Sequence, residues 1–312
     1  MKTLIILNPH AASGRALKHF KSVKPLLSEF FEVMRVAVSS HECELEPHLR
    51  RAFDDGFDTV LALGGDGTNF AVVNALAEAG GLKKGVTFAT LPFGTGRDWA
   101  RTLGMPEKAC AMLGWLAEGM PQLVDVGCVT IDGQRSLFLN VASAGISGAM
   151  APRVNATRVK RPWTFLQATV STLFSFEAPQ IRVFLDGNAW YEGGALLLAV
   201  GNGRFFGRGM KVCPNAFIND GLFEVVLIED MSTLQALRAL PTLLKGTHIQ
   251  RHDVHVRRAR KVRLESIDET LDLEMDGEPN QGQVIEFELL PSVLRMLVDP
   301  KVEAIKLAPS VK

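Results

Sequence analysis

Cysteine is scarce in this chain and forms no recognisable pairing. The four cysteines lie far apart and include no CxxC pair: Cys43, Cys110, Cys128 and Cys213. This spacing gives no zinc knuckle or redox dithiol, and it is typical of buried thiols in a reducing compartment. Three histidines have metal-like spacing but no fourth ligand nearby, so we expect no zinc site at them: His248, His252 and His255.

Long apolar runs and net charge are absent too. The first apolar run, Leu4–Leu7, is shorter than the core of a signal peptide, and the longest later run, Ala195–Val200, has six residues, against roughly 20 for a bilayer span. Lys plus Arg number 34, as do Asp plus Glu, so no net charge draws the whole molecule onto nucleic acid. We therefore expect a cytoplasmic protein that is not integral to a membrane and has no nucleic-acid partner.

The composition is that of a globular protein with more than one domain. Apolar residues make up 47% and charged residues 22%, which excludes disorder, collagen and coiled coil. The length of 312 residues, at about 150 per domain, predicts two domains.

Residues 1–122 alternate short apolar strands with amphipathic helices. The strands are expected at 3–7, 33–38, 59–63 and 86–90, with 8–15 as a loop and 16–31 as a helix. Leu45, Leu49, Ala52 and Phe53 form one apolar face of the next helix. Crossover connections of this length predict an open α/β domain with a parallel sheet.

From about Leu123 the pattern changes to closely spaced strands, with helices expected at 163–176 and 233–244. Four Asp-Gly pairs signal hairpins: Asp132-Gly133, Asp186-Gly187, Asp220-Gly221 and Asp276-Gly277. We predict a β-rich antiparallel second domain at 123–297, with 298–312 as a candidate to return to the first. A cleft between the two domains is the expected ligand site.

Three glycine-containing loops follow strands of the first domain, where ligands bind in open α/β sheets. They are Asn8–Ala16, Gly64–Thr68 before a helix expected near Asn69, and Leu91–Asp98. Glycines let backbone N–H groups approach phosphate oxygens, and a helix N-terminus adds a favourable dipole. A single such loop is usually only a turn, whereas three at one sheet edge favour phosphate binding.

The loops match neither familiar nucleotide fingerprint. GxxxxGK[ST] is absent, and no GxGxxG with a later acidic residue follows the first strand, which argues against a P-loop NTPase and a dinucleotide dehydrogenase. Asp66 within a glycine cradle would repel phosphate, so it makes sense beside a cation or as a base.

The motifs together resemble the diacylglycerol kinase catalytic-domain family, and most of all its bacterial soluble lipid kinases, which are related to sphingosine kinases and, distantly, NAD kinases. The resemblance rests, in order, on NPHAASGRA, GGDGTNFAVVNAL, LPFGTGRDWAR, NVASAGISG, VGNGRFFGRGMKVCPNAFINDGLFEV and EMDGEP. It implies an N-terminal nucleotide-binding α/β domain, a C-terminal antiparallel β-sandwich, and ATP and Mg²⁺ as cofactors.

The resemblance also implies roles for single residues. The residues expected to contact ATP are Asn8, Ser39, Gly64, Gly65, Gly67, Thr68, Asn69, Gly94 and Thr95. Arg97 stands where the family usually has Asn, and it pairs either with phosphate or with a neighbouring carboxylate.

A structural Mg²⁺ is implied at Asp220 and the backbone carbonyls of Phe217 and Leu222, with a plain hairpin as the alternative. Asp66, Asp276 and Glu278 are the candidate catalytic carboxylates, because phosphorylating an alcohol needs a proton acceptor and a metal that neutralises phosphate charge. In similar kinases the position of Glu278 is the proposed acceptor, but the sequence does not assign the base among the three. Asp276-Gly277 could alternatively be a hairpin only.

A basic segment favours a lipid acceptor. Between Asp132 and Glu177 there is no acidic residue, while five cations occur: Arg135, Arg153, Arg158, Lys160 and Arg161. The helix expected at 163–176 carries Trp163, Leu166, Val170, Leu173 and Phe174 at helical spacing. It either lies at a headgroup surface or packs in the core.

We therefore expect an ATP- and Mg²⁺-dependent kinase of a lipid alcohol such as diacylglycerol or a sphingoid base, which associates transiently with a peripheral membrane surface. A homodimer is one option for its assembly. The rivals are a kinase of a soluble alcohol, as in the NAD kinase reaction, and a nucleotide-sensing protein without activity.

Overall fold

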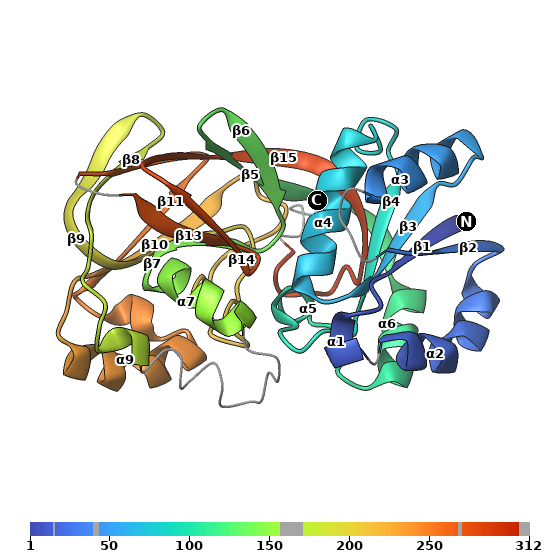
Figure 1. The fold of residues 1–312 in the computed structure, drawn as a ribbon, viewed down its shortest axis with the longest axis horizontal. Coiled ribbons are helices and arrows are strands. Elements are labelled where there is room, and N and C mark those ends of the chain that lie inside the picture. Colours follow the sequence, from blue (N-terminus) through green and yellow to red (C-terminus); the bar gives the residue numbers. More distant parts are fainter. Residues whose placement is uncertain (15, 40–43, 157–170, 268–269, 306–312) are drawn as a thin grey trace, which may run out of the picture. The chain divides into compact units, whose positions relative to one another are not determined.

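The computed structural model describes residues 1–312 except 15, 40–43, 157–170, 268–269 and 306–312 (Figure 1). The chain divides into two compact units. Unit 1 comprises Met1–Val126, Ile218–Asp220 and Pro291–Lys312, and unit 2 comprises Gly127–Phe217 and Gly221–Leu290. Each unit has its own arrangement of strands and helices.

Unit 1 contains a parallel sheet in the order β15-β4-β3-β1-β2. Its strands are β1 (Lys2–Leu7), β2 (Val33–Val38), β3 (Thr59–Gly64), β4 (Thr87–Pro92) and the end of β15 (Val284–Val298). Strands β3 and β4 are buried along their whole length, as expected for parallel strands covered on both faces. The predicted parallel α/β arrangement is confirmed.

Helices connect these strands. They are α1 (Ala11–Gly14), α2 (Ala16–Phe30), α3 (Leu45–Asp54), α4 (Asp66–Glu78), α5 (Asp98–Thr102) and α6 (Ala109–Glu118). The apolar face predicted for α3 is the buried face in the structure.

Two details of these helices were predicted wrongly. The segment expected as a loop at 8–15 includes α1, and α4 begins at Asp66 rather than near Asn69, because Gly65 is an extended N-cap.

Unit 2 is built from antiparallel strands that form two sheets joined by one long strand. The strands are β5 (Met120–Ile131), β6 (Gln134–Phe138), β7 (Val141–Gly145), β8 (Gln180–Leu185), β9 (Asn188–Gly201), β10 (Phe223–Glu229), β11 (Val254–Ala259), β12 (Lys261–Ser266), β13 (Leu271–Met275), β14 (Glu278–Gly282) and β15. Strand β9 pairs with β8 as far as Gly194 and with β10 and β7 beyond it. Gly193, with φ 153°, lies at this transition. The predicted antiparallel sandwich is confirmed.

Three of the four predicted Asp-Gly hairpins are present. Asp132, Asp186 and Asp276 all have φ near 50°, and each following glycine also has a positive φ. These are the values that a two-residue type I′ turn requires. The fourth prediction is wrong: at Asp220-Gly221 only the glycine has a positive φ, and the pair lies in the loop before β10.

Helices α7 (Ile146–Ala156) and α9 (Thr233–Lys245) and the short η2 (His248–Gln250) complete unit 2. An apolar core that includes Ile146 and Ala236 lies between the strands and these helices. Most of the helix predicted at 163–176 lies outside the described residues, as do the side chains of Arg153, Arg158, Lys160 and Arg161. No helix in the described part of the chain is both long and apolar enough to cross a membrane.

Two cysteines and two histidines of unit 2 have clear environments. Cys128 and Cys213 are buried free thiols, as predicted. His248 Nε2 lies 3.0 Å from the carbonyl oxygen of Val212, and His255 Nε2 lies 2.7 Å from a carboxylate oxygen of Glu229.

Candidate functional site

The loops after β1, β3 and β4 are bonded to one another at the carboxyl edge of the unit 1 sheet. Asn8 Nδ2 donates to Thr68 Oγ1 at 3.2 Å, which ties the first loop to the first turn of α4. The N–H groups of Phe93 and Gly94 donate to the Gly64 carbonyl at 2.7 and 2.9 Å, which ties the third loop to the second. The predicted glycine loops therefore form one continuous surface.

Close backbone packing explains the glycines in this surface. A Cβ at Gly64 would lie 2.1 Å from Thr68 Oγ1, and a Cβ at Gly94 would lie 2.4 Å from the Gly65 Cα. Only glycine fits either position without moving backbone. The first N–H groups of α4 begin at this crossing, and such groups lack partners within their own helix. The geometry suits an anion held by backbone donors.

Asp66 is the first residue of α4, and its carboxylate points to a second helix. Its Oδ2 accepts the Asp98 N–H at 3.3 Å, and its Oδ1 accepts the Trp99 N–H at 3.2 Å, so it caps α5. Burial raises the pKa of Asp66, while these N–H groups and the charge of Arg101 oppose the shift. The carboxylate thus holds the loop 93–98 in place, which explains an acidic residue in a glycine cradle.

Arg97 bonds to backbone carbonyls, and its pairing with phosphate stays a prediction. Its Nη2 donates to the Pro106 carbonyl at 2.7 Å and its Nη1 to the Glu107 carbonyl at 3.2 Å. Its backbone is left-handed, with φ 61°, a conformation that asparagine tolerates better than arginine. The guanidinium therefore secures the connection after α5.

Asp98 and Arg101 are site residues that the sequence did not single out. Arg101 Nη1 donates to Asp98 Oδ1 at 2.8 Å and to the Gly96 carbonyl. The pair stabilises the same loop that Asp66 holds. An Asp and an Arg three residues apart on a short helix could have been recognised as an i,i+3 pair.

The remaining predicted nucleotide contacts fall into two groups. Thr95 is exposed and Gly67 is half-buried, near the glycine crossing in sequence. Asn69 is buried and accepts the Thr90 hydroxyl at 2.8 Å, so its side chain joins α4 to β4. Ser39 follows β2, and its N–H donates to the Leu7 carbonyl at 3.1 Å, beside the start of the first loop. Asn69 thus has a structural role, and its contact with ATP stays a prediction.

In unit 2, the Asp276 carboxylate organises the turn between β6 and β7. It accepts the N–H groups of Leu139 at 2.7 Å, Asn140 at 3.0 Å and Val141 at 3.2 Å. Asn140 in turn donates to the Phe205 carbonyl and accepts the N–H of Asn202. A carboxylate with this many backbone donors positions its neighbours.

Glu278 begins β14, directly after the Asp276-Gly277 turn that joins it to β13, and is half-buried. Its backbone lies opposite Met275 in the β13–β14 ladder. Asp66 and Asp276 both accept backbone N–H groups with their two oxygens, and the role of Glu278 as a proton acceptor stays a prediction.

The segment 213–217 is held by a buried polar cluster of unit 2. Glu224, a buried carboxylate on β10, accepts the Asn215 N–H at 2.7 Å and its Nδ2 at 3.2 Å. Arg204 Nε donates to the Ala216 carbonyl at 2.9 Å. The guanidinium carbons of Arg204 and Arg258 lie 5.5 and 5.9 Å from the Phe217 ring centroid. The cluster fixes the backbone just before the predicted magnesium ligands.

The donor set of that implied magnesium site fits the ion. One carboxylate, Asp220, and two backbone carbonyls, at Phe217 and Leu222, are hard oxygen ligands of the kind that Mg²⁺ accepts. The intervening Ile218 carbonyl accepts the Asp125 N–H at 2.7 Å, and the Ile218 N–H donates to the Ala304 carbonyl at 2.8 Å. The residue between the ligands is therefore fixed by unit 1.

Glu224 predicts a pH effect on stability. Burial raises the pKa of its carboxyl above the ordinary 4.5, although Asn215 and the two arginines oppose this. The favourable contribution of the protonated group is therefore complete below pH 4.5 and is lost as pH rises through the raised pKa. We expect the wild type to lose stability relative to Glu224→Gln over this interval. Urea unfolding of both proteins at a series of pH values tests this, and parallel curves would contradict it.

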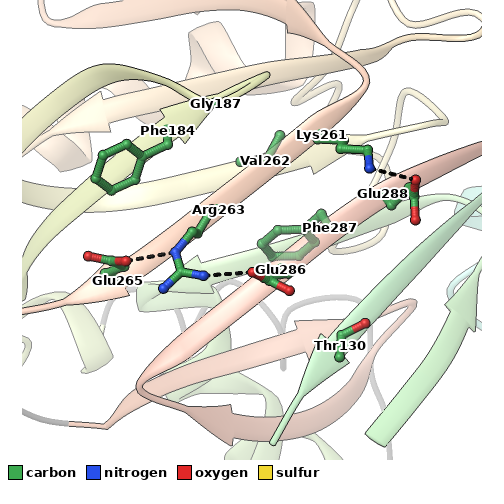
Figure 2. Close-up of a pocket in the computed structure, with 10 residues that line it drawn as sticks. All are labelled: Thr130, Phe184, Gly187, Lys261, Val262, Arg263, Glu265, Glu286, Phe287 and Glu288. Atoms are coloured by element: carbon green, nitrogen blue, oxygen red, sulfur yellow. Dashed lines mark hydrogen bonds and ion pairs between the residues drawn. The ribbon is translucent and has the colours of Figure 1, made fainter. Parts of the chain in front are cut away.

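A pocket of about 450 Å³ on unit 2 contains none of the predicted site residues (Figure 2). It lies over β8, β12, β15 and β5. Its cations are already paired: Arg263 bonds Glu265 and Glu286, each at 2.7 Å, and Lys261 lies 3.1 Å from Glu288. Each of these cations thus pairs with a carboxylate on the same face of the sheet, so the charges that line the pocket neutralise one another.

Family models match both halves of the chain. Residues 2–129 match the diacylglycerol kinase catalytic domain, and residues 140–298 match the YegS C-terminal NAD kinase beta sandwich-like domain.

Curated relatives match along nearly the whole length. A protein of Pseudomonas aeruginosa named "Probable lipid kinase YegS-like" is 32% identical, with 95% of this chain and 93% of that protein covered. A "Diacylglycerol kinase" of Mycobacterium tuberculosis is 28% identical, with 95% and 94% covered. The crystal structure of a diacylglycerol kinase from Bacillus anthracis superposes with a TM-score of 0.70 at 22% identity, covering 96% of this chain and 98% of that one, and supports the fold.

Proposed function

This chain belongs to the diacylglycerol kinase catalytic-domain family of lipid kinases, and from that membership we propose that it transfers the γ-phosphate of ATP to the hydroxyl of a lipid alcohol such as diacylglycerol or a sphingoid base. The observation that carries the proposal is the crossing of Gly64–Gly65 with Phe93–Gly94 at the carboxyl edge of the unit 1 sheet. Helix α4 begins at this crossing, and a helix N-terminus suits phosphate oxygens.

In this proposal the unit 1 loops bind the nucleotide. The glycine backbone at 64–67 and 94 approaches the phosphates, with hydroxyls and amides from Asn8, Ser39, Thr68, Asn69 and Thr95 around them. Asp66 and Arg97 act by holding the loops in place, since their side chains bond to backbone groups.

Asp220 and the carbonyls of Phe217 and Leu222 would hold Mg²⁺. An ion bound there would have the structural role that the family resemblance implies, holding the loop before β10. Glu278 accepts the proton of the lipid hydroxyl while the hydroxyl oxygen bonds to the γ-phosphorus and ADP leaves. The Asp276 carboxylate positions the turn between β6 and β7, while Asp276 itself lies in the turn that precedes Glu278.

We expect Gly65→Val to weaken ATP binding about tenfold or more, because a Cβ there already lies 3.3 Å from the Gly94 Cα and a branched side chain separates the two loops. Gly65 has φ −106°, so the effect comes from space and not from backbone conformation. Gly114→Ala is the matched control, since its Cβ meets nothing within 4 Å. Calorimetric titration measures the ATP affinity of both variants. An unchanged affinity for Gly65→Val would mean that the loop is only a turn and does not bind phosphate.

The function itself is tested with radiolabelled ATP, Mg²⁺ and a total lipid extract. We expect label in the organic phase, and mass spectrometry of the labelled product identifies the acceptor. Omitting Mg²⁺ or adding a chelator should abolish the label. Label confined to the aqueous phase would support a kinase of a soluble alcohol, and no label in either phase would support a nucleotide sensor.

We extend the proposal to a cytoplasmic protein that associates transiently with the membrane where its acceptor is dissolved. A homodimer stays a prediction, which light scattering during size-exclusion chromatography tests.

A further inference from the structure

Helix α9 exposes a leucine near each of its ends. Its buried residues are Ala236 and Ala239, with exposed fractions of 4% and 9%, and Leu237, Leu240 and Leu243 are partly buried against the apolar core of unit 2. Leu234 and Leu244 are 56% and 60% exposed. The outer face of a surface helix is ordinarily polar, so these two leucines call for an explanation. In Figure 1, α9 lies on the same side of the unit 2 strands as α7.

The exposed apolar residues of α9 lie on one face. Positions 234, 237, 241 and 244 lie three or four residues apart, which places the exposed Leu234, Pro241 and Leu244 on neighbouring turns, with the partly buried Leu237 at the edge that meets the core. Phe174, 72% exposed, adjoins the start of this face, because Thr233 Oγ1 donates to the carbonyl of Leu173 at 3.1 Å. We call these five side chains the α9 apolar stripe. An apolar group of this kind on a surface marks an interaction site.

The charges within the helix are all positive. The exposed Arg238 and Lys245 flank the stripe, and α9 contains no acidic residue. The nearest carboxylate in sequence, Asp230, lies beside Gly194 on β9. Apolar side chains with flanking cations are the pattern of helices that lie in the headgroup region of anionic membranes.

The helix itself is firmly built, so the exposed leucines do not belong to a fraying end. Ser232 and Gln235 form a reciprocal capping box at its start. Gly246 ends it in the left-handed conformation, and the Lys211 N–H donates to the Leu243 carbonyl at 2.9 Å.

We propose that the α9 apolar stripe, with Arg238 and Lys245, docks on an anionic phospholipid bilayer. This docking rests on the proposed function for its biological purpose, because it would bring the kinase to the bilayer that holds its lipid acceptor. A second copy of the chain fits the stripe less well. An isologous dimer would bring the same cations of two copies together with no α9 carboxylate to pair them.

Sedimentation with vesicles of phosphatidylcholine, with and without phosphatidylglycerol, tests the proposal without nucleotide. We expect Leu234→Gln combined with Leu244→Gln to weaken binding about tenfold. Arg238→Glu combined with Lys245→Glu should weaken it about 30-fold on anionic vesicles and remove its salt dependence. The matched controls are Met120→Gln with Leu123→Gln, both 55% exposed in the wild type, and the exposed pair Lys83→Glu with Lys301→Glu. Both controls should bind as the wild type does.

Phosphorylation of dioctanoylglycerol presented in detergent should be unchanged in the α9 variants. If vesicle binding follows the prediction but no lipid is ever phosphorylated, the docking surface stands and the proposed function fails.

Two outcomes would overturn the docking proposal. One is equal vesicle binding by the α9 variants and the wild type. If Lys21→Glu with Lys24→Glu on α2 then abolishes binding, the membrane contact lies at α2 and not at α9. The other is a concentration-dependent dimer that Leu234→Gln with Leu244→Gln disrupts, which would assign the stripe to a second copy.

Discussion

Glu278→Gln is expected to lower kcat for lipid phosphorylation by about 10²-fold to 10⁴-fold, because glutamine has the shape of glutamate but cannot accept the hydroxyl proton at neutral pH. Nucleotide affinity should stay near that of the wild type, since the phosphate-binding loops belong to unit 1. The half-buried position of Glu278 at the start of β14 predicts little effect on folding. Steady-state kinetics at saturating lipid, with calorimetric titration of ATP, measures both quantities.

Asp276→Asn is the informative comparison for Glu278. The Asp276 carboxylate accepts the N–H groups of Leu139, Asn140 and Val141, and an asparagine NH₂ would face at least one of them. We therefore expect a loss of about 2 to 4 kcal/mol in the free energy of unfolding, with activity falling as a consequence. If Glu278→Gln keeps normal kcat while a well-folded Asp276→Asn loses it, the assignment of the base is wrong.

Asp66→Asn is expected to reduce phosphoryl transfer by about 10²-fold or more and to destabilise the loop 93–98. The substitution keeps the size of the side chain but places an amide NH₂ against the Asp98 or Trp99 N–H. Asp66→Glu is not expected to restore activity, because there is little space beside the carboxylate. A Cβ built at Gly96 would lie only 2.5 Å from Asp66 Oδ2, so a longer side chain at position 66 would press against Gly96.

The pH profile separates the two possible roles of Asp66. If Asp66 only positions the loop, the base is intact in Asp66→Asn, and the variant keeps the acidic limb of the kcat profile at a lower plateau. If Asp66 is the base, the variant loses that acidic limb. Because the pKa of Asp66 is raised, the wild-type carboxylate begins to protonate above pH 3.8 as the pH falls, and an additional loss of activity is expected there that the variant lacks. Near-wild-type turnover by Asp66→Asn would remove the residue from the mechanism.

The local elements could be predicted because their signals lie within a few residues. The buried face of α3 follows from the period of Leu45, Leu49, Ala52 and Phe53, and the type I′ turns follow from Asp-Gly between alternating strands. The same rule failed at Asp220-Gly221, since the preceding strand β9 ends at Gly201 and no neighbouring strand is there to pair. The start of α4 was missed because a glycine N-cap has no side-chain signature.

The partners of the site carboxylates could not be predicted, since they lie far away in sequence. Asp276 meets Asn140 across 136 residues, and Asp66 meets Trp99 across 33. Glu224 carried a usable signal, because it is the charged residue within the apolar strand Phe223–Ile228. A carboxylate at such a position must find partners, and Asn215 supplies them. The catalytic and binding roles of the predicted residues themselves stay predictions.

The most direct test of this account is the transfer of label from γ-radiolabelled ATP to dioctanoylglycerol or a sphingoid base, measured side by side for the wild type and Glu278→Gln. If the chain is a lipid kinase with Glu278 as its base, the wild type gives Mg²⁺-dependent label in the organic phase. The variant gives about 10²-fold less label and has an equal ATP affinity. Equal labelling by the two proteins, or wild-type label that enters only water-soluble products, would contradict it.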